Sequence, residues 1–594
     1  MKKIILLFAV LLAFASNAFA QLSSDPNNSF YADAQTWERN GLVDALPPIR
    51  PYPVKIIKKI LTSVIDKGNE SQSAKAKDYW EELTGRPFHA ELEAHGTYKN
   101  SDGDSSFSFS YFPEVNGDAG LLDDIIGIGY KVGFGGYTQK ALDYIRSYVP
   151  YGNSLAHDTL QDPGELGPFQ MYLDTNDVLS VGNDNFFLQI GLNRMGYGRF
   201  LGEGLALNEN AYHSGNIVFT VFYDRWNYTQ LYSAIGSSKS YDGSKLQSDK
   251  FLAFHQFEFN ITPKFSISYY ENMIFGQRFD FSYLIPAPYM ALQGIGGCND
   301  NLQMGLMFNV KPIKGLLWST DLFVDDVSFN ELVKFNLDTK IRAALSTGVI
   351  YSPENSMFNN FALQYSLVTP YTYTHWDYTD PVNYTIDDKT FNYQNYTNNG
   401  LPIGSTLPPN SDSVKFSFDM TPIKNLNLGF NFMFMRHGNS SETLPADEAV
   451  RYLVADPEVY ATDGSIYQHT VNVCDGTEGW GYLSSAWHKL NFLNQQHKMY
   501  LFQIGLDADY CTPKFKWGQF TVRGGYTAEF IINKGVDSHM FPGVRAEPEV
   551  GDTYTYNGNS YTAEELVNMF KNDWISNLTN QFNNYLYLAV HYRW

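Results

Sequence analysis

The sequence is poor in cysteine, in charged residues and in long apolar runs. Its 594 residues include three cysteines, Cys298, Cys474 and Cys511, which can form at most one disulfide and lack the spacing of a metal site. Charged residues make up 18% of the chain, below the roughly 25% of ordinary soluble domains. After the signal-like N-terminus no stretch approaches about 18 consecutive apolar positions, so a bundle of membrane-spanning helices is excluded.

Basic residues are also scarce, with 42 Lys and Arg against 63 Asp and Glu, for a formal charge of −21. This balance argues against nucleic acid as a partner, because nucleic acid needs a basic patch that displaces counterions. A neutral glycan or a divalent cation fits the charge better. No cofactor is expected beyond a loosely bound cation such as calcium. Aromatic residues are abundant, at 16%, which excludes a disordered acidic chain.

The N-terminus predicts export from the cytoplasm. Lys2 and Lys3 precede an apolar run, and Ala18-Phe19-Ala20 follows it. This is the pattern of a secretory signal peptide, here residues 1–20, with cleavage near Ala20. Position 21 is Gln and no cysteine lies near it, which argues against a lipid anchor.

Residues 21–86 predict a small helical module. Apolar residues recur at helical spacing from Phe30 to Trp37 and again from Val54 to Ile65, and a third helix is expected at about 73–83. A proline-rich connector at 46–53 separates the first two helices. Three short helices cannot bury much apolar surface by themselves. We therefore expect a periplasmic module that packs on something larger.

From Phe88 the hydrophobic period changes from 3.6 residues to 2, which indicates strands with one apolar and one polar face. In the first such segment Phe88, Ala90 and Leu92 alternate with His89 and Glu91. The same alternation recurs at 426–434, 500–510, 520–530 and 586–594.

A transmembrane barrel explains this pattern better than a soluble sandwich or solenoid, since neither of those needs so many exposed aromatic residues. A barrel has an apolar lipid face, aromatic rims and a polar lumen. The last strand ends on Trp594, like the C-terminal signal that the barrel-assembly machinery recognises in outer-membrane proteins. We expect an all-β transmembrane antiparallel β-barrel over 87–594, with about 14 to 18 strands and 18 as the best estimate.

Long polar segments rich in Gly, Pro and Asn are expected to be loops on the cell-surface side of the barrel. They span 152–167, 237–250, 375–412, 440–480 and 537–563.

No catalytic constellation emerges from the sequence, so no enzymatic activity is expected. Asp325 and Asp326 are adjacent on a strand and should point to opposite faces, which does not suit a glycosidase pair. The glycine-rich stretch at 127–136 alternates like a strand with no helix after it, so it is not a phosphate-binding loop.

One stretch, from Pro370 to Tyr378, combines aromatic faces that can stack on sugar rings with polar groups that can bind hydroxyls. It contains Tyr371, Tyr373, His375 and Trp376. The alternative interpretation is an aromatic girdle at the membrane interface that runs into a loop.

Short motifs spread over most of the chain give it a resemblance to a known family. They follow the proline-rich connector and occupy 193–199, 205–211, His255, 270–276, 283–286, 300–301, 325–326, 370–375, 401–404 and 409–413. Their residue types and order resemble the capsule-assembly Wzi family of outer-membrane proteins.

The resemblance implies an outer-membrane barrel of about 18 strands with a periplasmic helical module, which binds and retains capsular or exopolysaccharide at the cell surface. Surface polysaccharide, outer-membrane lipid and lipopolysaccharide are the partners it implies. Glu271 falls on the apolar parity of the strand that contains Ile267 and Tyr269, where a lipid-facing carboxylate would be costly. We expect a bulge or a strand end to turn Glu271 into the lumen.

Three functions remain open at this point: a polysaccharide-binding barrel, a porin or substrate-specific channel with an acidic lumen, and an outer-membrane enzyme. For the first, the candidate carbohydrate-binding residues are Tyr371, Tyr373, His375, Trp376, Arg194, Glu271, Asp326 and Arg436. No metal ligand is assigned.

Overall fold

The computed structural model describes most of the chain from Leu22 onward. The described ranges are 22–85, 88–138, 165–236, 250–276, 278–296, 300–336, 339–374, 384–386, 389–391, 395–398, 401–454, 489–538, 540–541, 547–548 and 553–594. The predicted signal peptide lies outside them, so its cleavage stays a prediction. In these ranges none of the helices has the length and apolar character needed to cross a membrane.

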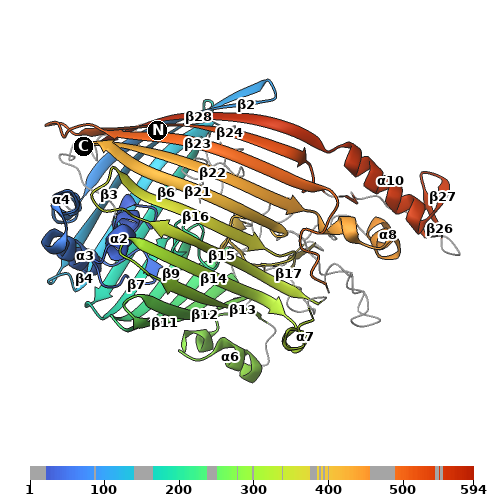
Figure 1. Ribbon diagram of the computed structural model, residues 1–594, viewed down its shortest axis with the longest axis horizontal. Helices are drawn as coiled ribbons and strands as arrows, with labels where there is room; N and C mark the ends of the chain where they lie inside the picture. Colours follow the sequence, from blue (N-terminus) through green and yellow to red (C-terminus); the bar gives the residue numbers. More distant parts are fainter. Residues whose placement is uncertain are drawn as a thin grey trace.

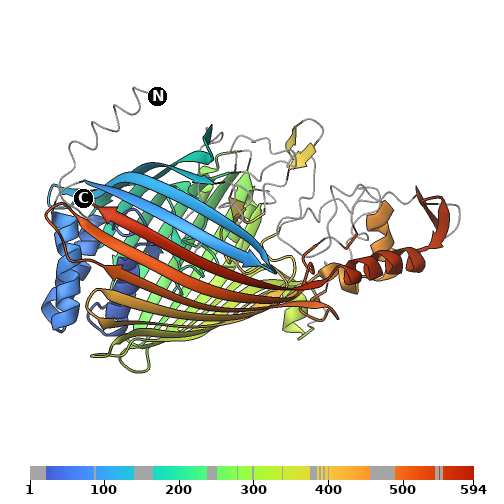
Figure 2. The same ribbon diagram turned by 90° about the horizontal axis from the view of Figure 1, so that it is seen from above.

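The described chain forms a closed antiparallel barrel of 18 strands (Figures 1 and 2), which confirms the predicted fold class. The ring closes where β2 (His89–Ser101) pairs with β28 (Thr579–Arg593). Between them, in ring order, lie β3 (Asp104–Leu121), β4 (Ile126–Thr138), β6 (Phe169–Gly182), β7 (Phe186–Asn193), β9 (Ser214–Tyr223), β10 (Trp226–Ile235), β11 (Lys250–Thr262), β12 (Phe265–Gly276), β13 (Asn301–Val310), β14 (Leu316–Val327), β15 (Ile341–Tyr351), β16 (Phe358–Val368), β21 (Ser411–Ile423), β22 (Leu426–Gly438), β23 (Lys498–Cys511) and β24 (Gln519–Lys534).

The outer and inner walls of the barrel differ as the alternation predicts. On β28, Leu586 and Leu588 point outward and are 54% and 58% exposed, whereas their neighbours Tyr585 and Ala589 are buried. Exposed aliphatic and aromatic side chains recur on the same parity of the paired strands, as with Ile504 of β23. Such a surface requires a lipid environment, and it is the apolar belt of a transmembrane barrel.

One end of the barrel has short turns, as at Asp224–Arg225 between β9 and β10. The opposite end carries the longer connections (Figure 1), including α6 between β12 and β13 and α7 between β14 and β15. In barrels of this type short turns face the periplasm and long connections face the cell exterior. The elements in the long connections are η3 (Phe281–Leu284), α6 (Tyr289–Gly296), α7 (Phe329–Val333), β17 (Tyr384–Ile386), β18 (Lys389–Phe391), β19 (Thr397–Asn398), β20 (Leu401–Pro402), η4 (Ser440–Thr443), α8 (Ala446–Val454), β25 (Glu547–Pro548), β26 (Thr553–Tyr556), β27 (Asn559–Thr562) and α10 (Ala563–Ser576), with the short β5 (Glu165–Leu166) paired to β6.

Three helices precede the barrel, as expected: α2 (Ser29–Arg39), α3 (Val54–Lys67) and α4 (Glu70–Thr84). Asn28 caps α2 by accepting a hydrogen bond from the Phe30 amide, and Asn69 forms a capping box at the start of α4. The apolar stripe of α3 is buried against α2 and α4 in one cluster that also includes Phe187 and Phe222 of the barrel. We call residues 22–85 the helical module. It lies at the short-turn end (Figure 2).

Glycines on the inner face of β4 allow the helical module to approach the wall. A Cβ at position 127 would lie 3.3 Å from Val54 of α3, and one at position 129 would overlap the Ser23 hydroxyl. The backbone amides of Leu22 and Ser23 donate to the carboxylate of Asp118 on β3, at 2.8 and 3.0 Å. The glycine-rich stretch noted in the sequence therefore serves close packing.

Candidate functional site

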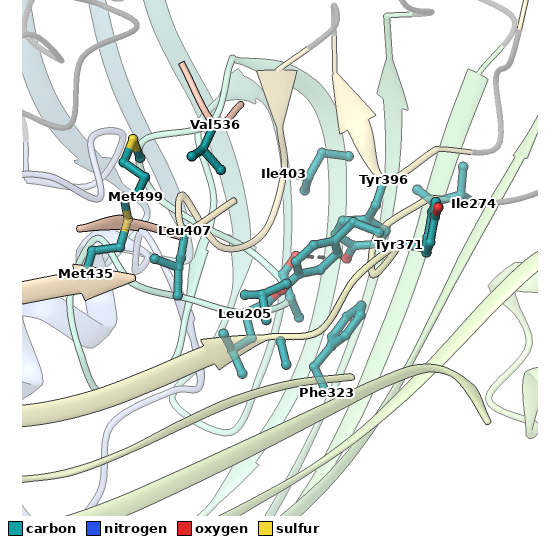
Figure 3. Close-up of a cluster of buried hydrophobic side chains, with 14 of the residues drawn as sticks. Leu205, Ile274, Phe323, Tyr371, Tyr396, Ile403, Leu407, Met435, Met499 and Val536 are labelled. Atoms are coloured by element: carbon teal, nitrogen blue, oxygen red, sulfur yellow. Dashed lines mark hydrogen bonds between the residues drawn. The ribbon is translucent and has the colours of Figure 1, made fainter. Parts of the chain in front are cut away.

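Segments between the strands fold back into the lumen. The connection at 194–213, between β7 and β9, contains β8 (Gly196–Tyr197), which pairs with β1 (Ile49–Arg50) of the helical module. The ring of Tyr197 packs against those of Phe254 and Tyr270, whose strand positions face inward, at centroid distances of 5.2 and 5.3 Å. Residues 369–374, 395–398 and 401–410 join the same buried cluster (Figure 3). We call these residues, together with 194–213, the infolded segments.

Tyr371 and Tyr373, two predicted sugar-binding residues, are buried among the infolded segments. Both side chains are at most 2% exposed, and both residues have positive φ, 61° and 71°, which marks a tight turn. The Tyr373 hydroxyl donates to the Leu205 carbonyl at 2.9 Å, and its ring packs on that of Phe323 at 4.9 Å. Tyr396 adds a hydrogen bond to the Ala206 carbonyl at 2.8 Å. Neither predicted tyrosine presents a ring face to solvent.

Side chains near the cell-surface ends of β11 and β14 also anchor these segments. The Lys250 ammonium, at the start of β11, is fully buried and donates to the carbonyls of Asn395 and Thr397 at 2.6 and 2.7 Å. The Asp325 carboxylate accepts from the Tyr373 amide at 2.7 Å. Side chains of the barrel wall therefore bind backbone groups of the infolded segments inside the lumen.

Asp325 and Asp326 do not point to opposite faces, contrary to the expectation from simple alternation. A register irregularity in β14 between Val324 and Asp326 places Asp326 opposite Arg342, with an ion pair of 3.4 Å. Lys340 pairs with the same Asp326 carboxylate. The side chain of Asp326 is 35% exposed, so it is open to a ligand from the cell-surface side. In the described ranges no group of three or more His, Cys, Asp or Glu is placed to hold a metal ion.

Glu271 does not turn into the lumen, so that expectation is wrong. Strand β12 continues to Gly276, and its pairing with β11 is regular through this region, which leaves Glu271 on the outward parity beside Tyr269. Its carboxylate accepts from the Tyr269 hydroxyl at 2.6 Å and lies 2.9 Å from the ring nitrogen Nε2 of His255. The side chain is buried because residues 278–296 fold over the outside of the wall there.

Arg436 also lies on the outward parity, near the cell-surface end of β22. It pairs with Asp412 of β21, with 2.9 Å between Arg436 Nε and the carboxylate, and the Tyr365 hydroxyl donates to the same carboxylate at 3.0 Å. The Arg436 side chain is 40% exposed. Guanidinium edges left free by a single carboxylate partner can bind hydroxyl or acidic groups of a ligand.

The remaining predicted residues are less accessible or lie elsewhere. Arg194 is 9% exposed at the start of the first infolded segment. His375 and Trp376 lie outside the described residues. The structure therefore leaves Asp326 and Arg436 as the accessible members of the predicted set, on different faces of the wall.

Buried ion pairs that the sequence did not single out tie the infolded segments to the helical module. Arg50 pairs with Glu209, with Nε 3.0 Å from the carboxylate and both side chains almost fully buried. Glu38 of α2 pairs with Arg199 at 2.8 Å and with Lys311 of the β13–β14 turn at 2.9 Å. Their only sequence signal was opposite charge in segments with few charges, and that signal does not identify the partners.

These pairs also shift proton affinities. Burial works to raise the pKa of Glu38, but the charges of Arg199 and Lys311 outweigh it and hold the pKa below its ordinary value. Glu82 of α4 forms a further ion pair, with Arg593 of β28; burial raises the pKa of Glu82, and the charge of Arg593 offsets only part of that effect.

The helical module reaches much of the barrel circumference. Besides its contacts with β3, β4 and the β13–β14 turn, the module reaches β16: Arg39 donates to Ser352 in the β15–β16 turn at 3.0 Å and to Asn360 near the start of β16 at 2.8 Å. Glu82 pairs with Arg593 of β28 at 2.6 Å. Contacts on opposite sides of the ring place the module across the short-turn end. The described part of the lumen is thus obstructed twice, by the infolded segments and by the module.

An apolar outer belt, a closed 18-stranded ring and an obstructed lumen define the class: an outer-membrane-type β-barrel. Among solved structures, the chain is similar to Wzi, described as an outer-membrane protein involved in group 1 capsule assembly in Escherichia coli and a carbohydrate-binding β-barrel. The TM-score is 0.51 with 11% identity, and the match covers 96% of this chain and 99% of that one. The resemblance to Wzi is thus confirmed at the level of fold.

Other solved structures give weaker matches. Pseudomonas aeruginosa OccK5 (OpdH) matches with a TM-score of 0.38 and 10% identity over 86% of this chain and 98% of that one. Acinetobacter baumannii OccAB4 matches with a TM-score of 0.37 and 10% identity over 86% and 100%. No protein-family model and no curated protein matches the chain.

Proposed function

We propose that the protein binds capsular or exopolysaccharide at its cell-surface end and retains it there, without passing it through the barrel. The observation that carries this proposal is the double obstruction of the lumen by the infolded segments and the helical module. A diffusion channel needs a continuous water-filled path, whereas a binding protein gains rigidity when its lumen is filled. The fold shared with Wzi, which binds carbohydrate, supports the same conclusion.

Within this proposal, the buried tyrosines form a frame, and accessible polar groups at the long-connection end contact the polymer. Asp326 offers a carboxylate and Arg436 a guanidinium, both of which hydrogen-bond sugar hydroxyls. His375 and Trp376 complete the candidate set, because Trp376 follows directly on the turn that Tyr371 and Tyr373 fix. A flat indole face stacks on the apolar face of a sugar ring.

A glycan-array measurement on the folded barrel tests polysaccharide binding. We expect selective binding of an oligosaccharide class, and a several-fold loss of affinity in Trp376→Ala and Asp326→Asn. Thr347→Ser is the matched control. It is a small change within β15 on the outer wall, where the Thr347 hydroxyl hydrogen-bonds to Thr320 of β14, and the variant should bind as the parent does. Absence of binding to any surface glycan, with the barrel intact, would overturn the proposal.

Retention in cells is a separate test. A strain that lacks the protein should synthesise its polymer but shed it into the medium, and restoring the gene should return the polymer to the cell fraction. A strain whose polymer stays equally cell-bound without the protein would contradict the proposed role.

A further inference from the structure

Three polar side chains interrupt the apolar outer face of the barrel. Gln230 of β10, His255 of β11 and Glu271 of β12 stand opposite one another in adjacent strands and all point outward. They share this parity with Trp226 and Phe259, which are 39% and 51% exposed and lie four residues nearer the short turns. We call these three residues the polar row.

The polar row lies within the height of the membrane. Four residues of strand correspond to about 13 Å along its axis, and the apolar band of an outer-membrane barrel is about 25 Å tall. Polar and ionisable groups that face lipid at such a depth are costly. Each of the three side chains is nevertheless at most 4% exposed, so the chain itself covers them.

The cover is the stretch 278–296, with η3 and α6, which follows the cell-surface end of β12 and lies outside the wall (Figure 1). We call it the outer flap. Its Tyr289 contacts the whole polar row: the backbone amide donates to Glu271 at 2.6 Å, the ring stacks on His255 at 4.1 Å, and Gln230 donates to the hydroxyl at 2.6 Å. Gln230 also donates to the Tyr283 carbonyl at 2.9 Å.

The far side of the outer flap is apolar. Residues 281–296 contain no charged side chain. Large apolar side chains stand exposed along the flap, and they are Phe279 (61%), Phe281 (68%), Ile285 (45%), Met290 (55%) and Ile295 (85%). A water-facing segment of this length would carry charges. This surface also continues the outward apolar row of the adjacent β13, with Leu302 and Met304.

We propose that the outer flap is a lipid-embedded wall of the protein, latched to the barrel by the polar row and inserted by its apolar side chains among the acyl chains of the outer leaflet. The polar row gives the flap a fixed seat that lipid cannot occupy, because lipid offers no hydrogen bonds to these three side chains. The exposed apolar face of the flap takes the place of the part of the apolar belt that the flap covers. This inference does not depend on the proposed polysaccharide function.

Nitroxide accessibility in lipid bilayers tests the proposal on the full-length protein. In a background with Cys298→Ser, Cys474→Ser and Cys511→Ser, one label is attached through Met290→Cys. Ile504→Cys, on the outer belt, is the lipid reference, and Phe335→Cys, 91% exposed in the β14–β15 connection, is the aqueous reference. We expect oxygen to relax the Met290 label several-fold more than a nickel chelate does, as for Ile504.

Either of two results for the Met290 label would overturn the lipid-embedded position of the flap. The first is a Met290 label that the nickel chelate reaches as readily as it reaches the Phe335 label. The second is dipolar coupling between Met290 labels on different molecules, which would assign the surface to self-association. Ile285→Cys, on the same face, repeats the measurement if Met290→Cys does not fold. Tyr289→Ala should make the Met290 label several-fold more mobile, and an unchanged spectrum would refute the latch.

Discussion

Glu38 joins three parts of the molecule that are far apart in the chain. It lies in α2 and is 4% exposed, and its carboxylate accepts hydrogen bonds from Arg199 in an infolded segment and from Lys311 in a strand turn. Removing one member of a buried ion network leaves its partners uncompensated, which costs about 3 kcal/mol or more. Glu38 is therefore one of the buried charged contacts that dock the helical module, beside Arg50–Glu209 and Glu82–Arg593.

We predict that Glu38→Gln weakens the docking of α2 by about 3 kcal/mol, which is about a hundredfold in the opening equilibrium. Hydrogen exchange of the α2 amides measures this opening directly. Lys77→Gln, at an exposed site on α4, is the matched control and should leave exchange unchanged. Equal protection in Glu38→Gln and the parent would show that packing alone holds the module.

The lowered pKa of Glu38 also predicts a pH dependence. A carboxyl whose folded pKa lies below its ordinary value of 4.5 stabilises the docked state above that pH, and the contribution disappears as pH falls through the folded pKa. Glu82 has a raised pKa, so its protonation at low pH favours the docked state and opposes the effect of Glu38. The contribution of Glu38 is therefore obtained by comparing the parent with Glu38→Gln, in which Glu82 is unchanged. Opening free energies from hydrogen exchange should fall below about pH 4.5 in the parent and show a smaller fall in Glu38→Gln.

At the scale of elements, strands and helices could be predicted because their signals are local. Alternation at 426–434 lies within β22, that at 586–594 lies within β28 except for Trp594, and the stripe from Val54 to Ile65 lies within α3. The infolded segments could not be predicted, because their partners are more than a hundred residues away, as for Tyr373 and Leu205. The prediction for Glu271 was wrong for a different reason: its cover, which includes Tyr289, is only 18 residues away, but parity predicts the face of a strand and not what covers that face.

The close approach of β4 to the helical module predicts a large effect for Gly129→Val. Any Cβ there would lie 3.0 Å from Asp118 Oδ1 and 3.1 Å from Ser24 Cβ, so residues 22–24 must move and lose their hydrogen bonds to Asp118. We expect a loss of several kcal/mol of stability, the usual range for overpacking combined with lost buried hydrogen bonds. The measurement is the transition temperature at which the folded barrel converts to the unfolded band in a detergent gel, and it should fall.

Gly524→Val on β24 is the control for this prediction, because a Cβ at that position meets nothing nearer than 3.6 Å. It should leave the transition temperature nearly unchanged. If both variants behave alike, the cost at Gly129 reflects strand propensity and not contact with the helical module.

At the scale of the whole molecule, the two obstructions are unequal. The infolded segments pack against the wall around β9 to β16, where Phe254, Tyr270 and Phe323 point inward. On the opposite wall, inward side chains such as Asp509 and Arg523 remain 41% and 46% exposed. That side of the lumen therefore contains water, and the helical module is what closes it toward the periplasm.

The open side of the lumen is acidic, so a passage through it should prefer cations. Asp419, Asp507, Asp509 and Glu93 face it, with Arg523 as the main opposing charge. A water-filled passage lined by excess carboxylates concentrates cations. In planar bilayers the parent should show no steady conductance, whereas a variant that lacks residues 22–85 should conduct with a preference for cations.

Neutralising two of these carboxylates tests the cause of that preference. In the shortened variant, Asp507→Asn with Asp509→Asn should reduce the cation preference and leave the conductance in place, because the passage keeps its width. Steady cation conductance in the parent would instead favour a channel over a protein that binds and retains polysaccharide. Silence in the shortened variant would mean that the infolded segments close the lumen without help, and the helical module would then serve only to brace the ring.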